Sequence, residues 1–266
     1  MTTSGVLNFT EMPIVDNGIK RFQFYEYEPV NGVNLHAGDI RINIEQQDLF
    51  KLPSEVFLLF EGQLVKADGT TYANTDVVAL TNNGIMHLFN QITYELLNQD
   101  IEAVYCPGHL FGFCDDYGKV IYGLKHTITL VRQSYDDAVF KLAGVAAGKV
   151  NLKKISLFML HVIPSDLERS NLYQQIEKKA TLPVSFRRRQ CETISVPQAT
   201  SFSWRLSVKT SPENPRYIIA GFQTNKSGDQ NANPSISDHC DLNNMYIILN
   251  QDRYPVVDYN LSFPNQ

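Results

Sequence analysis

Residues 39–46 read DIRINIEQ, and this stretch decides the class of fold. Every second residue is isoleucine and the residues between them are polar or charged, the isoleucines being Ile40, Ile42 and Ile44. Successive side chains of an extended chain point to opposite faces, so the pattern predicts a strand with one buried face. Isoleucine is also branched at Cβ, which favours strands over helices.

Other stretches read as strands for the same reason. They are rich in β-branched and aromatic residues, and turn residues such as Asp68–Gly69 separate them. Near the end of one of them, Phe202, Trp204 and Leu206 alternate with polar residues, so we expect Trp204 to anchor a buried face. Strands are expected over residues 24–29, 39–46, 56–72, 119–132, 150–163, 182–190, 192–208, 216–223, 244–250 and 256–263.

Helices are expected to be few and short. Residues 163–180 read IPSDLERSNLYQQIEKKA, where Ser165 and Glu168 have the spacing of a capping box. Residues 82–92 are expected to form a turn or two of helix before another strand. Strands and helices do not alternate along the chain, so we do not expect a parallel doubly wound sheet. The sequence predicts an all-β protein of two antiparallel jelly-roll sandwiches with one or two short inserted helices.

A change of composition marks the expected junction between the sandwiches. Residues 141–150, KLAGVAAGKV, are small and rich in glycine and alanine. We therefore expect a flexible N-terminal arm over residues 1–20, a first jelly roll over 21–145 and a second over 146–266.

Composition and charge exclude some classes of protein. The formal net charge of −5 is unlike that of a protein binding nucleic acid over its whole surface. No apolar run reaches 18 residues, so no membrane span is expected, and the N-terminus lacks the pattern of a secretory signal. The four cysteines, at 106, 114, 191 and 240, include no CxxC pair and are expected to be free thiols.

The chemistry-bearing residues gather in SISDHCDLNN, residues 235–244. His239 and Cys240 could act as base and nucleophile, or bind a metal with Asp238 and Asp241. Neighbours on an extended strand point to opposite faces, however, and aspartate favours turns. We therefore favour a loop that leads into a strand, and we keep a jelly-roll enzyme using His239 and Cys240 as an alternative. The six histidines form no HxH or HExxH motif, so we expect no catalytic residue, metal or cofactor.

The one concentrated basic run is Arg187, Arg188 and Arg189, within VSFRRRQCETI. On a strand, Arg187 and Arg189 share a face and Arg188 takes the other. These side chains are candidates for contacts with a partner subunit or a polyanion, and the plainer interpretation is a solvated face with salt bridges.

Four blocks of the sequence resemble those of a known family, in the family's order. They are DIRINIEQQDLFKLPSEVFLLFEGQLVKADGT (39–70), LTNNGIMHLFNQITYEL (80–96), FGFCDDYGKVIYGLKHTITLVR (111–132) and PRYIIAGFQTNKSGDQNANPSISDHCDLNNMYIILNQDRYPVVDYNLSF (215–263). Together they resemble the double jelly-roll major capsid proteins of Polinton (Maverick) elements and adintovirus-like viruses. The resemblance runs from about Phe22 to Phe263.

The resemblance implies two upright jelly rolls in a virion shell. Three copies would form a pseudo-hexagonal trimer, and trimers would tile an icosahedral shell around double-stranded DNA that is touched only indirectly. Minor capsid or penton proteins would be further partners, assembly would take place in the nucleus or cytoplasm, and no secretion would be involved. The long polar loop at residues 224–240 then supplies candidate subunit contacts through Asn225, Asp229, Asn231 and Asp238.

The chain departs from the family at one place. In the family, a long stretch normally separates the block that ends near IEAVYCPG (101–108) from the block that begins FGFCDDY, but here Gly108 is followed directly by His109. The first jelly roll is therefore expected to be short, with unpaired strand edges. A capsid-derived β-sandwich binding protein that forms no shell is the main alternative function.

Overall fold

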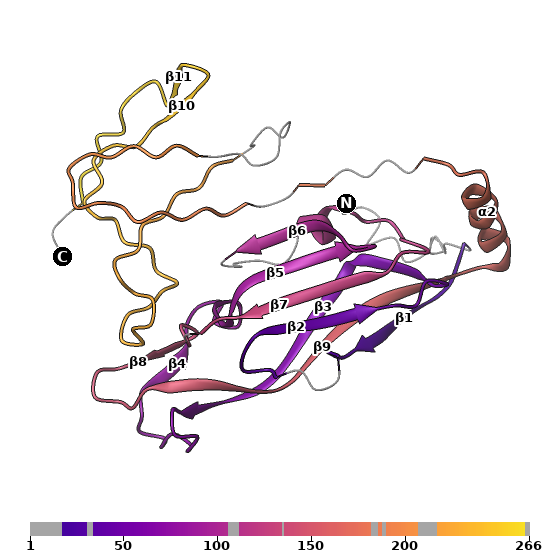
Figure 1. Cartoon of the computed structure of the whole chain (residues 1–266), viewed down its shortest axis with the longest axis horizontal. Coiled ribbons are helices and arrows are strands. Elements are labelled where there is room, and N and C mark those ends of the chain that lie inside the picture. Colours follow the sequence, from indigo (N-terminus) through magenta and orange to yellow (C-terminus); the bar gives the residue numbers. More distant parts are fainter. Residues whose placement is uncertain are drawn as a thin grey trace, which may run out of the picture. The chain divides into compact units, whose positions relative to one another are not determined.

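The computed structural model describes residues 18–30, 34–105, 112–134, 136–181, 186–187, 190–206 and 217–263. Within these residues the protein is mostly β, with short α-helices at Gly112–Asp116 (α1) and Asp166–Glu177 (α2) (Figure 1). The all-β prediction with one or two short helices is confirmed.

The longest strands form a three-stranded sheet in the order β1-β9-β3. These strands are β1 (Ile19–Tyr27), β9 (Gly148–Pro164) and β3 (Phe50–Lys66). β1 and β9 are antiparallel, with Phe24 opposite Leu160 and Tyr25 opposite Met159. Because the register alternates, one face carries Phe22 and Phe24 and the other carries Tyr25 and Tyr27.

The second large sheet has four antiparallel strands in the order β2-β7-β5-β6. They are β2 (Asp39–Ile44), β7 (His126–Arg132), β5 (Phe89–Leu96) and β6 (Gln99–Tyr105). The stretch that predicted the fold is β2, and its three isoleucines are at most 1% exposed. Phe60 of β3 lies 5.7 Å from Phe89 of β5, measured between ring centroids, so the two sheets pack face to face.

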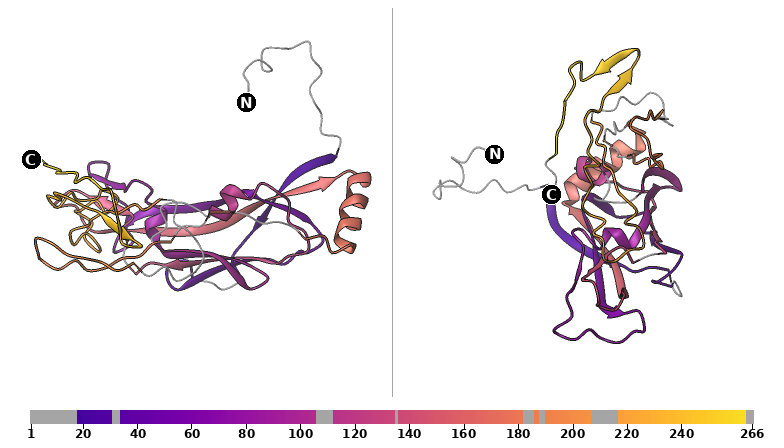
Figure 2. Two further views of the ribbon diagram at one scale, coloured as in Figure 1. Left: turned by 90° about the horizontal axis from the view of Figure 1, so that it is seen from above. Right: turned by 90° about the vertical axis from the view of Figure 1, so that its left-hand side faces the viewer.

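Helix α2 begins where the sequence predicts it. Ser165 is the N-cap, and its hydroxyl accepts a hydrogen bond from the Glu168 amide at 3.4 Å. The helix directly follows β9 and lies near the start of β1 (Figure 2). The expected helical turn within residues 82–92 is also present, as the 3-10 helix η2 at Met86–Leu88 ahead of β5.

The remaining strands are short. β4 (Val78–Leu80) pairs with β8 (Val139–Lys141), and β10 (Ile247–Leu249) pairs with β11 (Asp252–Tyr254). Each strand of these two pairs has three residues, so each pair contributes only a few inter-strand hydrogen bonds.

The chain divides into two compact units, each assembled from separate stretches. The first holds the described residues up to Gln63, Phe89–Arg132 and Leu152–Cys191, and the second holds Leu64–Leu88, Gln133–Asn151 and the described residues from Glu192 onward. The predicted division into residues 1–20, 21–145 and 146–266 stays a prediction.

Several expected strands are absent where the structure describes the chain. Residues 192–206, 217–223 and 256–263 carry no ladder beyond one bridge between Phe222 and Asp238. Trp204 is 38% exposed, so its predicted role as a buried anchor is wrong. Residues 202–206 do alternate apolar and polar side chains, but a strand also needs a hydrogen-bonded neighbouring strand. Residues 182–185, 188–189 and 207–216 lie outside the described residues.

Candidate functional site

The loop at residues 224–240 is held by a buried carboxylate that the sequence did not single out. Asp137 is 8% exposed, and its Oδ1 accepts a hydrogen bond from the Gly228 amide at 2.7 Å. Its Oδ2 accepts a bond from the Ser227 hydroxyl at 3.2 Å. Gly228 has a φ of +79°, a conformation that residues with a Cβ rarely adopt. Glycine at this position therefore lets the loop bend onto Asp137.

Gln230 fixes the same loop through its side-chain amide. Its Oε1 accepts a bond from the Gly148 amide at 2.8 Å, and its Nε2 donates to the Gly148 carbonyl at 2.6 Å. The Lys141 amide in turn donates to the Gln230 carbonyl at 2.8 Å. The side chain satisfies both backbone groups of Gly148, as a neighbouring strand would.

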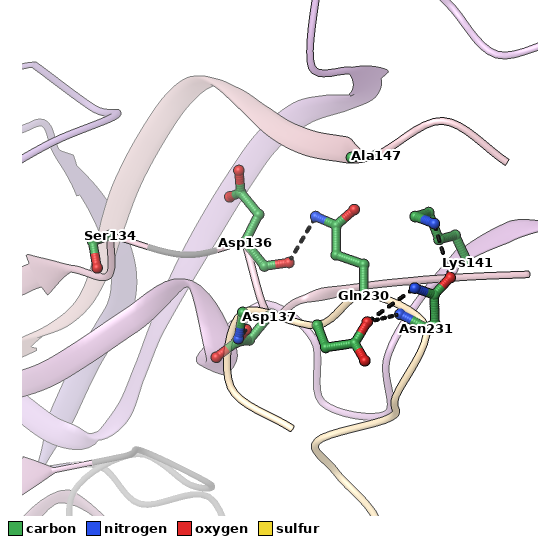
Figure 3. Close-up of a pocket in the computed structure, with 9 residues that line it drawn as sticks. Ser134, Asp136, Asp137, Lys141, Ala147, Gln230 and Asn231 are labelled. Atoms are coloured by element: carbon green, nitrogen blue, oxygen red, sulfur yellow. Dashed lines mark hydrogen bonds between the residues drawn. The ribbon is translucent and has the colours of Figure 1, made fainter. Parts of the chain in front are cut away.

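These contacts surround a polar cavity of about 380 Å³ (Figure 3). Lys141 donates to Asn231 Oδ1 at 2.8 Å, and the Asn231 amide and side-chain NH₂ both donate to Asp229 Oδ1. The lining groups thus bond mainly to one another, and the arrangement stiffens the loop. In the part of the chain that the structure describes, no group of three His, Cys, Asp or Glu residues could hold a metal ion.

The four predicted contact residues of this loop have different surroundings. Asn225 is exposed with a φ of +45°, and Asp229 and Asn231 are exposed but pair with each other. Asp238 is half-buried and accepts bonds from the Thr224 amide and hydroxyl. Hydrogen bonds from Lys226 and Thr224 lower the pKa of Asp238 to about 2, so its carboxylate stays charged at neutral pH. Their role in subunit contacts stays a prediction.

His239 and Cys240 lie in a turn. Cys240 and Asp241 both have left-handed backbone conformations, with φ of +47° and +48°. His239 Nδ1 accepts a bond from the Asp241 amide at 3.0 Å, and its ring stacks on Phe263 with centroids 4.6 Å apart. The Cys240 side chain is exposed and free. The contacts of His239 are those of a turn residue, and they direct its Nδ1 to the backbone rather than to a thiol.

Of the three arginines, only Arg187 is among the described residues. Its backbone amide and its guanidinium both donate to the Asp116 carboxylate, the amide at 2.7 Å and Nε at 2.9 Å. The Arg187 side chain is 68% exposed, so the pair lies at the surface. Arg188 and Arg189 lie outside the described residues. The structure therefore gives Arg187 a partner within the chain, and its proposed contact with a polyanion or another subunit stays a prediction.

A cluster of polar side chains is buried between the sheets of the first unit. Lys51 has no exposed surface, and its ammonium donates to the Leu124 carbonyl at 2.8 Å. His126 is also fully buried, and its Nδ1 lies 2.6 Å from the Tyr94 hydroxyl. His161 is 1% exposed, and its Nε2 lies 3.1 Å from the Tyr27 hydroxyl.

Burial sets the charge of this cluster. Loss of solvation, helped by the nearby charge of Lys51, lowers the pKa of His126 to about 3 and that of His161 to about 4. Loss of solvation also lowers the pKa of Lys51 to about 8. At neutral pH both imidazoles are therefore neutral and the amine is mostly charged. With the side chains enclosed, the cluster acts on stability rather than on a substrate.

The outer face of the three-stranded sheet carries exposed aromatic side chains. Phe24 and Phe57 make an edge-to-face pair with centroids 5.4 Å apart, and Phe57 stacks on Phe158 at 4.9 Å. Phe22 and Phe24 are 55% and 47% exposed, and Phe57 and Leu59 are 45% and 39% exposed. We call Phe22, Phe24, Phe57, Leu59 and Phe158 the aromatic face. Exposed apolar side chains gathered on one face are a common feature of interaction surfaces.

Sequence reasoning missed the residues that carry most of this chemistry. Asp137 and Gln230 look like ordinary turn and loop residues, and only the fold brings residues 227–231 against residues 137–148. Lys51 and the two histidines are scattered along the chain without a motif. The alternation of β1 could have indicated the aromatic face, because Phe22 and Phe24 share one side of that strand.

Comparison with known proteins gives one family and one solved structure. The family described as "Double jelly roll-like domain" matches residues 90–266, about two thirds of the chain, which confirms the predicted fold class. The Faustovirus major capsid protein is similar at 9% sequence identity with a TM-score of 0.31. That alignment covers 63% of this chain and 59% of the Faustovirus protein. A search of curated proteins found no match. Among the described residues, no helix is long and apolar enough to cross a membrane.

Proposed function

The chain belongs to the double jelly roll-like domain family, and we propose that it is a major capsid protein of the Polinton and adintovirus-like kind. In this role it assembles with copies of itself into pseudo-hexagonal trimers. The trimers build an icosahedral virion shell around double-stranded DNA. The sequence blocks that resemble that family, from residues 39–70 to 215–263, support the proposal.

The aromatic face is the observation that carries this proposal. Four of its large apolar side chains are more than a third exposed, although they lie on regular strands of the best-packed unit. Apolar side chains gain free energy only when water is removed from them, at about 25 cal/mol per Å². A shell protein functions through such surfaces, because each copy covers the exposed face of another.

The direct test is the mass of the purified protein in solution. Size-exclusion chromatography with light scattering should give a species near three times 30.2 kDa, and negative-stain microscopy should show particles. A strict monomer at every protein concentration would contradict the proposal.

A pair of variants tests whether the aromatic face joins the copies. Phe24→Asp places a charge within the face and should reduce the trimer to monomer. Val30→Asp makes the same kind of change at a site of similar exposure, 49%, off the sheet, and should leave the trimer intact. If both variants remain trimeric, the aromatic face is not the surface that joins the copies.

A further inference from the structure

Strand β3 forms an open edge of the three-stranded sheet. Among the described residues it is the last strand in the order β1-β9-β3. Its two ends meet other segments, since Lys51 exchanges backbone hydrogen bonds with Ile121 and the Lys66 amide donates to the Thr70 carbonyl. Between these ends, the backbone of residues 55–63 bonds to no described segment outside the sheet. Unpaired N–H and C=O groups along a regular edge are a template for another strand.

Two acidic side chains flank the apolar residues of this edge. The residues that alternate along the side of β3 with the aromatic face are Glu55, Phe57, Leu59 and Glu61, and all are exposed. Neither glutamate makes an ion pair within the described residues. Antiparallel pairing of two β3 strands about Leu58 would place Glu55 of one copy opposite Glu61 of the other. Like charges directly opposite are destabilising, so this edge favours a basic strand over another β3.

Strand β1 has the complementary charge at the other end of the same sheet. Lys20 and Arg21, near its start, are exposed and make no ion pair within the part of the chain that is described. The register of β1 with β9 is regular from Arg21 onward, so Phe22 and Phe24 lie on an undistorted edge. The free side of β1 therefore offers basic residues followed by apolar ones.

The two edges of the four-stranded sheet fit β3 less well. Strand β6 contains Asp100 and Glu102 and no basic residue, so its charge has the same sign as that of β3. The open side of β2 is partly occupied, because the Arg41 carbonyl accepts a hydrogen bond from the Val30 amide at 3.0 Å. Of these edge strands, β1 is the one that is both basic and open.

We propose that β1 of one copy pairs with the β3 edge of the next copy, so that the three-stranded sheet continues from copy to copy. This inference rests on the proposed function, because it names the contact that closes the trimer. Phe22 and Phe24 of the incoming strand lie beside Phe57 and Leu59, and the basic start of β1 meets a glutamate of β3. Apolar pairs and opposite charges on neighbouring strands stabilise a sheet. The contact joins two different edges, as closure of a cyclic trimer requires.

Exchange of charges across the contact tests the pairing. Light scattering over a dilution series measures the protein concentration at which half of the trimer has dissociated. The variant Glu55→Lys, Glu61→Lys and the variant Lys20→Glu, Arg21→Glu should each raise this concentration by at least about ten-fold, because like charges then face each other. The quadruple variant restores opposite charges and should return the concentration toward that of the wild type.

A control separates the contact from the effect of net charge. Glu177→Lys with Asp252→Lys changes the net charge as much as Glu55→Lys with Glu61→Lys does, at exposed positions away from β3. It should leave the trimer unchanged. A trimeric wild type that is unaffected by either double variant, or not restored in the quadruple variant, would overturn the pairing and leave the proposed function standing. A monomeric wild type would overturn both.

Discussion

Apolar side chains in alternating stretches are buried in the first unit and exposed in the stretch at residues 192–263. Both contain stretches that alternate apolar and polar residues, yet Ile40 and Ile42 of β2 are fully buried while Val257 is 75% exposed and Tyr259 is 56% exposed. β2 has a ladder partner in β7 and belongs to a four-stranded sheet. In residues 192–263, the described strands are β10 and β11, with three residues each. Alternation determines which side chains share a face of the strand. That face is buried only where another sheet or helix packs against it.

Truncating one isoleucine in each region should give the largest contrast. Ile42→Ala removes a fully buried side chain and should lower the free energy of unfolding by about 2–5 kcal/mol. Ile219→Ala removes one that is 94% exposed and should change it by less than about 0.5 kcal/mol. Urea denaturation of both variants provides the measurement. A similar loss in both variants would mean that Ile219 is covered in solution, and the comparison would fail.

Acid should weaken the first unit selectively. The folded-state pKa values of His126 and His161, about 3 and about 4, lie below the ordinary value of about 6.5, so the unfolded chain binds these protons first. Their contribution is complete above pH 6.5 and declines as the pH falls toward 4. The decline is at most about 1.4 kcal/mol per pH unit for each histidine.

Substitution of one histidine isolates this effect. His126→Phe should flatten the dependence of unfolding free energy on pH between 6.5 and 4, while the exposed His239→Phe should leave it as in the wild type. Urea midpoints measured at several pH values provide the comparison. The same slope in all three proteins would rule out His126 as a source of acid sensitivity.

The loop that contains Gln230 should be the firmest part of the stretch at residues 192–263. Gln230→Glu replaces the donor to the Gly148 carbonyl with an oxygen that repels it, at a cost of about 1–3 kcal/mol. The amides of Gly148 and Lys141 should then exchange faster with deuterium. Gln251→Glu, at an exposed position in the same stretch, should change neither. Unaltered exchange at Gly148 in the Gln230 variant would show that the loop is held elsewhere.

The smallest effect is expected at the surface ion pair. Arg187→Ala removes the guanidinium bonds to Asp116 and keeps the bond from the backbone amide. It should cost about 0.2–1 kcal/mol, since exposed ion pairs contribute little. The cost should shrink as salt is added, which thermal denaturation at low and high ionic strength can measure. If the free energy of unfolding falls by more than about 2 kcal/mol and the loss does not change with ionic strength, Arg187 is buried in an assembly.

Local pattern predicted much of the first unit. The alternation of residues 39–46 gave β2, and the capping residues Ser165 and Glu168 gave α2. Both are local signals, because a strand's faces and a helix's first turn depend on neighbours in sequence. Predicted ends were less accurate. β1 begins at Ile19, five residues earlier than expected, and β7 begins at His126, seven residues later.

The polar loop and the buried cluster could not be predicted in the same way. Gln230 meets Gly148 across 82 residues, and the hydroxyl of Tyr27 meets His161 across 134. Such pairs depend on which strands become neighbours in space, and no short motif in the sequence encodes that choice. The prediction for Trp204 failed for a related reason, since its exposure depends on a layer that the alternation of residues 202–206 does not specify.

Because Lys51 is buried, the rate at which its amine is chemically modified reports how often the first unit opens. Amine-reactive reagents modify lysines that water can reach, and the Lys51 side chain has no exposed surface in the folded protein. Its amine becomes available only while the sheets are transiently open. The rate at which Lys51 is labelled therefore depends on the frequency of opening. The labelling rate of partly exposed lysines such as Lys154 gives the reactivity of the reagent in the same sample.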